Sequence, residues 1–327
     1  MTTTIGGTTG VTFPDASTQN TAATGFGFKN RIINGAMGIW QRGTSFTLSA
    51  GVTTYTADRW YVNTTGGAGV VSQTGSVGAY SLRISGASGV TSGFFGQKVE
   101  SVNIADCAGS TITYKIRASS SVLTSLTWYA RYPNSQDNYA GVTSISNGTI
   151  NITSTPTDYT FQITLPSGAN NGFEVYFTFG AFTSGTLDIT LVQLEKGSTA
   201  TSFDYRPHGT ELTLCQRYYC KTFPQEIAPA QNTSIYGGSL SNLTGSSAFT
   251  GNATVNWRYP VVMRTTPTIS IYTPGATGSG RFTDSGGGSV AASATNTGDA
   301  STMIYSSGGA ANVNSYAYVH AAAAAEL

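Results

Sequence analysis

Short runs of alternating apolar and polar residues recur through the first two thirds of the chain. Each run is rich in β-branched or aromatic residues and is bounded by Gly, Ser, Asn or Pro. Because successive side chains of a strand point to opposite faces of a sheet, this period of two predicts strands buried on one side. The runs are residues 80–84, 111–116, 126–132, 149–153, 159–165, 173–179 and 187–194. They predict a jelly-roll-like β-sandwich over residues 29–206.

An apolar opening at residues 32–40 precedes these runs, and we expect Trp40 and Trp60 to lie in the core. The segment before it, residues 1–28, is rich in Gly, Thr, Ser and Ala and too polar to hold a core of its own. We interpret this segment as an N-terminal stem or anchor that is ordered by partner chains. A flexible leader is the alternative.

A weaker alternating pattern continues over residues 226–327. It predicts strands at 254–263, 268–272, 303–305 and 313–320, while the Gly- and Ser-rich stretch 276–298 predicts long loops. The alanine run at 321–325 could end a strand or form a tail. We therefore expect a second, smaller β-sandwich domain, which makes the protein all-β.

A helical period replaces the alternation between the two domains. Leu212, Cys215 and Tyr219 are spaced i, i+3 and i+7, so a helix over residues 211–220 would have one apolar face. Pro224 would end it. Residues 207–225 are thus predicted to be a linker with a short helix, which could pack around the three-fold axis of a homotrimer.

Composition excludes several classes of protein. Only 9% of the residues are charged and the net charge is +1, without the basic cluster that nucleic-acid binding requires. With 39% hydrophobic residues the chain can form a packed core, unlike a disordered chain. No run approaches the ~20 apolar residues that span a bilayer. The N-terminus lacks the features of a secretory signal, so we expect the protein to be made in a cytoplasm.

Patterns for catalysis and metal binding are weak. His208 and His320 lie at no ligand spacing, and Cys215 and Cys220 do not form a C-x-x-C pair. No local spacing brings two carboxylates together as a glycosidase requires. The sequence predicts a protein that is not an enzyme and has no cofactor. A structural Ca²⁺ bound by backbone oxygens and one or two Asp residues stays an open alternative.

Clusters of aromatic and polar residues are the remaining candidates for ligand contact. Aromatic rings pack on the apolar face of a sugar, and amide, carboxylate and guanidinium groups bind its hydroxyls. The candidate cluster in the first domain is Tyr129, Arg131, Tyr132, Asn134, Gln136, Asp137, Asn138 and Tyr139. The second candidate patch, in the last domain, is Tyr272, Arg281, Asp284, Tyr305, Tyr316 and Tyr318. These tyrosines could equally pack between the chains of a trimer.

Three parts of the chain resemble bacteriophage tail fibre proteins. The opening at residues 30–43 with 55–60 resembles the start of a jelly-roll module of such fibres. Residues 192–207, continuing into 214–219, resemble its end and the linker that follows. Residues 257–267 with Glu326-Leu327 are similar to a terminal fibre domain. The resemblance implies a carbohydrate-binding-like jelly-roll module and a homotrimeric receptor-binding protein.

The function implied is adhesion of a virion to host surface polysaccharide. The partners implied are sister chains and, through the N-terminus, other tail or baseplate proteins, and the location is the virion. A structural decorating fibre of capsid or baseplate without a receptor role is one alternative. Another is a small glycan hydrolase or deacetylase that uses Asp137 or Glu174.

Overall fold

The computed structural model describes residues 28–243, 253–275, 278–284, 288–306 and 316–327. It also assigns three short antiparallel strands before residue 28, β1 (Thr4–Gly6), β2 (Gly10–Thr12) and β3 (Thr18–Gln19). The remainder of the segment expected to be a stem lies outside the described residues.

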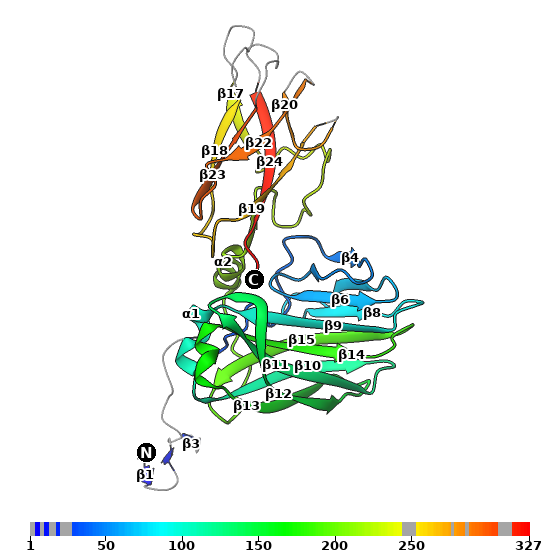
Figure 1. Ribbon diagram of the computed structural model, residues 1–327, viewed down its shortest axis with the longest axis vertical. Coiled ribbons are helices and arrows are strands. Elements are labelled where there is room, and N and C mark those ends of the chain that lie inside the picture. The colour runs from blue at the N-terminus through cyan, green and yellow to red at the C-terminus, as the bar shows by residue number, and fades with distance from the viewer. Residues whose placement is uncertain are drawn as a thin grey trace.

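The first domain contains two antiparallel six-stranded sheets (Figure 1). We name each after its second strand. The order in the β10 sheet is β13 (Thr157–Thr164), β10 (Thr111–Ser120), β15 (Thr186–Lys196), β8 (Ser81–Ser85), β7 (Val70–Thr74) and β4 (Ser45–Thr47). The order in the β11 sheet is β12 (Asn138–Asn151), β11 (Ser125–Ser135), β14 (Phe173–Phe179), β9 (Ser92–Val99), β6 (Tyr61–Thr65) and β5 (Thr54–Tyr55). Neighbours in each sheet are mostly distant in sequence, as in a jelly roll.

Alternation along the strands builds the core between the sheets. In β14, Phe173, Val175 and Phe177 are buried, whereas Tyr176 is only partly buried. The core is stacked across the two sheets, since the rings of Trp128 and Phe161 lie 4.1 Å apart. The sequence expectation of a sandwich with strands buried on one side is confirmed.

Trp40 and Trp60 are core residues, as expected. Trp60 is fully buried and its Nε1 donates a hydrogen bond to the carbonyl oxygen of Asn34. Trp40 is 7% exposed and its Nε1 donates to the carbonyl oxygen of Met37. Both indole N–H groups are thus satisfied inside the opening segment.

The short helices lie at one end of the sandwich and at the domain junction. The first domain contains α1 (Ser101–Ile104) and the 3-10 turns η1 (Ala105–Cys107) and η2 (Ser167–Asn171). Helix α2 (His208–Gln216) follows Pro207, whose fixed φ suits a helix start. None of the described helices is long and apolar enough to cross a membrane.

The helix expected at 211–220 is displaced. Tyr219 lies in strand β16 (Tyr219–Lys221), because these residues pair with the free edge of a strand in the second domain. Leu212 and Cys215 remain on α2, and Cys215 is fully buried against Ile33 and Ile39. Leu212, Cys215 and Tyr219 therefore do not form one helical face, and Cys215 is not accessible to a sister chain.

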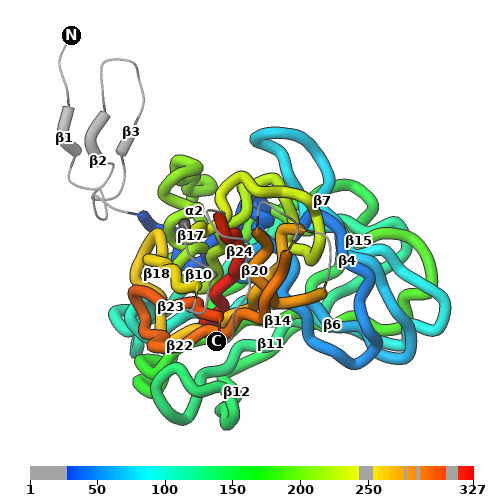
Figure 2. The backbone as a smooth tube through the Cα atoms, turned by 90° about the horizontal axis from the view of Figure 1, so that it is seen from above, coloured from blue at the N-terminus to red at the C-terminus, as the bar shows by residue number. Residues whose placement is uncertain are grey.

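The second domain is built around β24 (Tyr316–Ala324). Strands β16, β20 (Arg281–Asp284), β17 (Leu240–Leu243) and β19 (Thr268–Tyr272) all pair with β24, and β21 (Ser289–Ala291) pairs with β20. A separate sheet has the order β18 (Thr254–Arg258), β23 (Ser301–Tyr305) and β22 (Ser293–Thr295). Figure 2 shows this domain standing over the α2 side of the first domain, with the β4 and β6 end left uncovered.

The structure corrects the expected loops at 276–298 and shows which alternative holds for the alanine run at 321–325. The stretch expected to form long loops contains β20, β21 and β22, because backbone pairing to β24 and β23 outweighs its weak strand composition. The alanine run ends a strand. Ala321, Ala322 and Ala323 are buried between β16 and β19, where small side chains fit two close neighbours.

Opposite faces of one strand give a direct test of this architecture. Phe177→Ala should lower the free energy of unfolding of the first domain by about 3–5 kcal/mol, because it leaves a cavity between the sheets. Tyr176→Ala, one position away on the outer face, should cost about 1 kcal/mol or less. Denaturant unfolding followed by fluorescence measures both. Equal losses would mean that β14 is not buried on one face only.

Candidate functional site

A row of aromatic rings crosses the outer face of the β11 sheet. The rings of Tyr129 and Tyr176 are stacked, with centroids 5.1 Å apart and planes 13° apart. Phe94 follows at 6.4 Å from Tyr176, and Tyr61 at 6.1 Å from Phe94. Tyr55 completes the row at 6.1 Å from Tyr61. These five side chains are called the aromatic face below.

Strand register explains how the row forms. Tyr129 pairs with Tyr176, Tyr176 with Gly96, and Gly96 with Tyr61. A Cβ on Gly96 would lie 2.5 Å from the Tyr61 hydroxyl and 2.7 Å from the Tyr176 Cβ. Glycine is required here because the tyrosines on the two neighbouring strands lean over the strand between them.

A charged row lies beside the aromatic face. Arg131 pairs with Glu174 and Glu174 with Lys98 across three strands. The Glu174 carboxylate is fully buried and accepts hydrogen bonds from the Tyr61 hydroxyl at 2.6 Å and from the Arg131 Nε. Burial, reinforced by Glu174, holds the pKa of Tyr61 well above its usual value, so its hydroxyl stays a donor.

Arg131 links the two rows. Its guanidinium carbon lies 4.5 Å from the centre of the Tyr176 ring, and its side chain is 31% exposed. Only its Nε is bonded to Glu174, so the terminal N–H groups face outward as donors. A planar molecule with an apolar face and hydroxyl or carboxylate edges could stack on the tyrosines and bind Arg131.

The structure separates the candidate residues of the first domain into two groups. Tyr129 and Arg131 lie on the aromatic face and its charged row, and Tyr139 borders them with its ring 4.9 Å from the Lys98 Nζ. Asp137 instead accepts hydrogen bonds from the backbone N–H and hydroxyl of Ser101. Gln136 donates to the same hydroxyl, so the hairpin tip is fastened to α1.

The other hairpin residues have structural contacts. Tyr132 packs against the core and covers Gly168. Asn134 accepts a hydrogen bond from Thr143, and Asn138 accepts one from its own hairpin at Ala140. The candidate cluster from Tyr132 to Tyr139 does not form an open loop, because β11 and β12 continue through most of it and only a tight turn remains.

The second candidate patch is divided by the fold. Tyr316 and Tyr318 lie near the start of β24, whereas Tyr272 pairs with His320 further along that strand and packs on Phe223. Tyr305 belongs to the other sheet of the domain. Arg281 is bonded to Ser289 and Asp284 is buried on β20. These residues do not converge on one surface.

Sequence reasoning missed Phe94, Tyr176 and Tyr61 as partners of Tyr129. The signal was present in part, since Tyr176 occupies an outward position of the predicted strand 173–179. The lateral order β11, β14, β9, β6 was not visible, because these strands come from separated parts of the chain.

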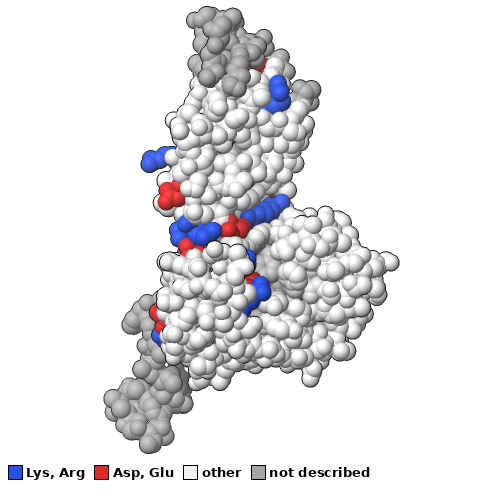
Figure 3. Space-filling view, in the orientation of Figure 1, with Lys and Arg blue, Asp and Glu red and all other residues white. Residues whose placement is uncertain are grey.

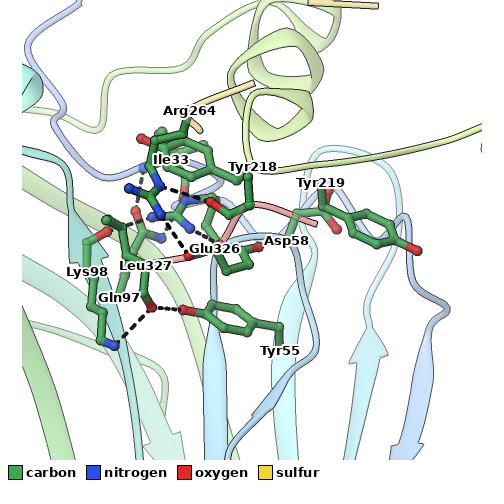
Figure 4. Close-up of polar contacts among 12 residues, drawn as sticks. Ile33, Tyr55, Asp58, Gln97, Lys98, Tyr218, Tyr219, Arg264, Glu326 and Leu327 are labelled. Carbon is green, nitrogen blue, oxygen red and sulfur yellow. Dashed lines mark hydrogen bonds and ion pairs between the residues drawn. The ribbon is translucent and has the colours of Figure 1, made fainter. Parts of the chain in front are cut away.

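Several charged residues lie at the junction of the domains. On the face shown in Figure 3 they gather at the waist, and both sandwiches are largely uncharged. Figure 4 shows the contacts there: the Tyr55 hydroxyl and Lys98 Nζ both donate to the Leu327 carbonyl oxygen at 2.9 Å. One end of the aromatic face thus borders the junction.

Glu326 is held by two guanidinium groups of the first domain. Arg59 is 1% exposed, pairs with the Glu326 carboxylate and stacks on Tyr218 at 3.5 Å. Arg42 pairs with the same carboxylate at 3.0 Å and stacks on Tyr219 at 3.7 Å. These two ion pairs fasten the second domain to the first.

Asp58 is buried in the same junction. It accepts hydrogen bonds from the backbone N–H and side-chain amide of Gln41, and its carboxylate lies 3.8 Å from Arg42. Burial outweighs these favourable contacts and raises the pKa of Asp58 to about 6.

Residues that could bind a metal are dispersed. Among the described residues no three His, Cys, Asp or Glu side chains gather in a metal-binding group. Cys107, Cys215 and Cys220 are buried free thiols, and burial raises the pKa of Cys220 to about 12. The cysteines are therefore core residues rather than nucleophiles.

Comparisons with known proteins give structural matches only. No family model and no curated protein matches the chain. A CBM4 structure matches with 18% identity over 50% of this chain and 98% of its own, at a TM-score of 0.36. A putative sugar binding protein from Bacteroides thetaiotaomicron matches with 14% identity over 52% of this chain and 100% of its own, at 0.35.

A phage protein is also among the matches. The enzymatically active domain of bacteriophage CBA120 tailspike protein 4 is 16% identical over 51% of this chain, at a TM-score of 0.33. The match spans 21% of that chain. At TM-scores this low, the description of the first domain as a β-sandwich rests on its own strand order.

The raised pKa of Asp58 makes stability depend on pH. The Asp58 carboxyl holds its proton more tightly in the folded protein than in the unfolded chain, where its pKa is 3.8. Its contribution to the free energy of unfolding is therefore full below pH 4 and is lost as the pH rises through 6. Relative to Asp58→Asn, the wild type should lose on the order of 3 kcal/mol of unfolding free energy across that window. Urea unfolding at several pH values measures the difference. Parallel curves for the two proteins would contradict the assignment.

Proposed function

We propose that this chain binds carbohydrate through the aromatic face of its first domain. The observation that carries the proposal is the stacked, partly exposed pair Tyr129 and Tyr176 with the Arg131 guanidinium over the Tyr176 ring. Sugar rings combine an apolar C–H face with a rim of hydroxyls, and this surface offers a partner for each. Glu174 pairs with Arg131 in the charged row beside the tyrosines, so the surface favours a polyhydroxylated ligand over a highly charged one.

We further propose that the protein is a bacteriophage virion fibre that attaches to host cell-surface glycans. Support comes from the segments that resemble tail fibre proteins, since they meet at the domain junction. Asn30 donates to the Val192 carbonyl oxygen and Gln41 to that of Tyr219. Arg264 donates to the carbonyl oxygen of Glu326. The resemblance therefore falls on residues that act together as one structural unit.

Homotrimer formation and attachment to tail or baseplate proteins through the N-terminus belong to the same proposal. A single shallow aromatic surface would bind sugar weakly. Three copies on a fibre, and several fibres on a particle, would raise the overall affinity through a high effective concentration. A decorating fibre without a receptor role would not need to bind sugar.

We do not assign a catalytic role to the carboxylates. Glu174 is fully buried and bonded to Tyr61 and Arg131, and Asp137 is bonded to Ser101. Neither arrangement leaves a carboxylate positioned to protonate a glycosidic oxygen. We therefore propose a binding protein rather than an enzyme.

A glycan microarray of bacterial surface polysaccharides tests the proposal. The wild type should bind a defined subset, and Tyr176→Ala or Tyr129→Ala should weaken that binding about tenfold or more, because truncating a central aromatic hot spot typically costs about 2 kcal/mol or more. Tyr316→Ala is the matched control, an exposed tyrosine in the other domain whose loss should change nothing. Absence of any wild-type signal, or equal loss in the control, would refute binding at the aromatic face.

A further inference from the structure

A cavity of about 680 Å³ lies at the domain junction, apart from the aromatic face. Its wall comes from the opening segment and the β7–β8 turn of the first domain, and from α2 with the chain leading into it. Gln225 at the end of the linker and Glu226 and Ala228 of the second domain complete it. The volume is within the ~300–1,000 Å³ typical of small-ligand sites.

Aromatic rings form one part of the wall. Tyr80 and Trp40 contribute from the first domain, and Phe203 and Tyr205 from the chain before α2. The Phe203 and Tyr205 rings meet edge to face at 4.7 Å, and Tyr205 is 60% exposed. An apolar surface of this kind can pack against a sugar ring.

Polar side chains with few or no hydrogen bonds to the rest of the protein form another part of the wall. Among the described residues, His208, Gln225 and Glu226 make no side-chain hydrogen bond or ion pair, and Gln73 makes only a long one, 3.4 Å, to the Met37 carbonyl oxygen. Donors and acceptors therefore converge on the cavity without being satisfied by the protein itself.

Two buried side chains in the wall add a second, independent observation. Gln41 is 1% exposed and its Oε1 has no partner, although its Nε2 is bonded to Asp58 and Tyr219. The Arg206 side chain is 4% exposed and its Nε has no partner, although its other nitrogens bind Glu211 and backbone carbonyls. Each unpaired atom has almost no accessible surface, so a ligand in the cavity would reach it only after the side chain rotates.

We propose that this junction cavity is a second binding site, for a neutral saccharide of one to three rings. Among the described residues of the wall, Arg206 is the only Lys or Arg and is paired with Glu211, while the Glu226 carboxylate forms no ion pair, so an anionic ligand is disfavoured. Aromatic rings beside free amide, imidazole and hydroxyl groups match a polyhydroxylated neutral ring. Because both domains contribute to the wall, the bound sugar would bridge them.

Gly38 provides a variant that fills the cavity without disturbing the fold. It lines the cavity, and a Cβ added to it would meet no atom within 4 Å. Gly38→Leu should therefore occupy the site. Gly180→Leu is the matched control, because Gly180 also has open space around its Cβ position and lies in the loop after β14, outside the cavity. Thermal unfolding should show both variants as stable as the wild type.

The experiment compares glycan microarray binding in a background that lacks the first site. Tyr129→Ala with Tyr176→Ala should abolish one set of signals and leave a residual set of neutral oligosaccharides. Adding Gly38→Leu should weaken the residual set about tenfold or more, and adding Gly180→Leu should leave it unchanged within about twofold. No residual set, or a residual set that survives Gly38→Leu, overturns the cavity site while leaving the aromatic face in place.

The assembled protein offers a second check. Hydroxyl-radical footprinting should label Tyr205 and the 89% exposed Val77 at the cavity rim whether or not the protein is oligomeric. Protection of both residues in the oligomer, without sugar, would mean that a sister chain occupies the cavity, and this result also overturns the proposal.

Discussion

The buried guanidinium of Arg59 is the contact on which the arrangement of the two domains depends. It belongs to the first domain, yet it pairs with Glu326 at the end of the second and lies over the Tyr218 ring between them. A charge that is 1% exposed is stable only while its partners stay in place, and removing one partner of such a pair typically costs about 3–5 kcal/mol. Its third bond, to the Lys98 carbonyl oxygen, connects the junction to β9.

Both candidate sites border this junction. Lys98 and Tyr55, at one end of the aromatic face, donate hydrogen bonds to Leu327. The cavity is lined by residues of both domains and by Gln41, which reaches Asp58 and Tyr219. The junction therefore sets the shape of two surfaces at once, and a ligand in the cavity would see a geometry that neither domain provides alone.

Much of the fold could be predicted because it follows from alternation along single strands. Residues 173–179 are a strand with Phe173 and Phe177 inside, as their pattern indicates. The first part of β24 was predicted as a strand at 313–320, but its continuation through the alanine run was left open, since alanine favours helices and only the neighbours β16 and β19 fix these residues as a strand. The short helix was displaced for the same reason, because the edge of β24 recruits Tyr219.

The candidate site was predictable only in part. Tyr129 and Arg131 were found because they lie close together in sequence, but Phe94, Tyr176 and Tyr61 join them through strand order and the absence of a side chain at Gly96. The hairpin residues Asp137 and Gln136 were predicted as ligand contacts because the sequence does not show that both form hydrogen bonds to Ser101 of α1.

The most direct measurement of the central claim is a crystal structure of the protein with its tightest array ligand. Our account predicts a sugar ring stacked on Tyr129 and Tyr176 with a hydroxyl or ring oxygen bound to Arg131. A ligand bound instead to the outer face of the β10 sheet, or to the second domain alone, would contradict it.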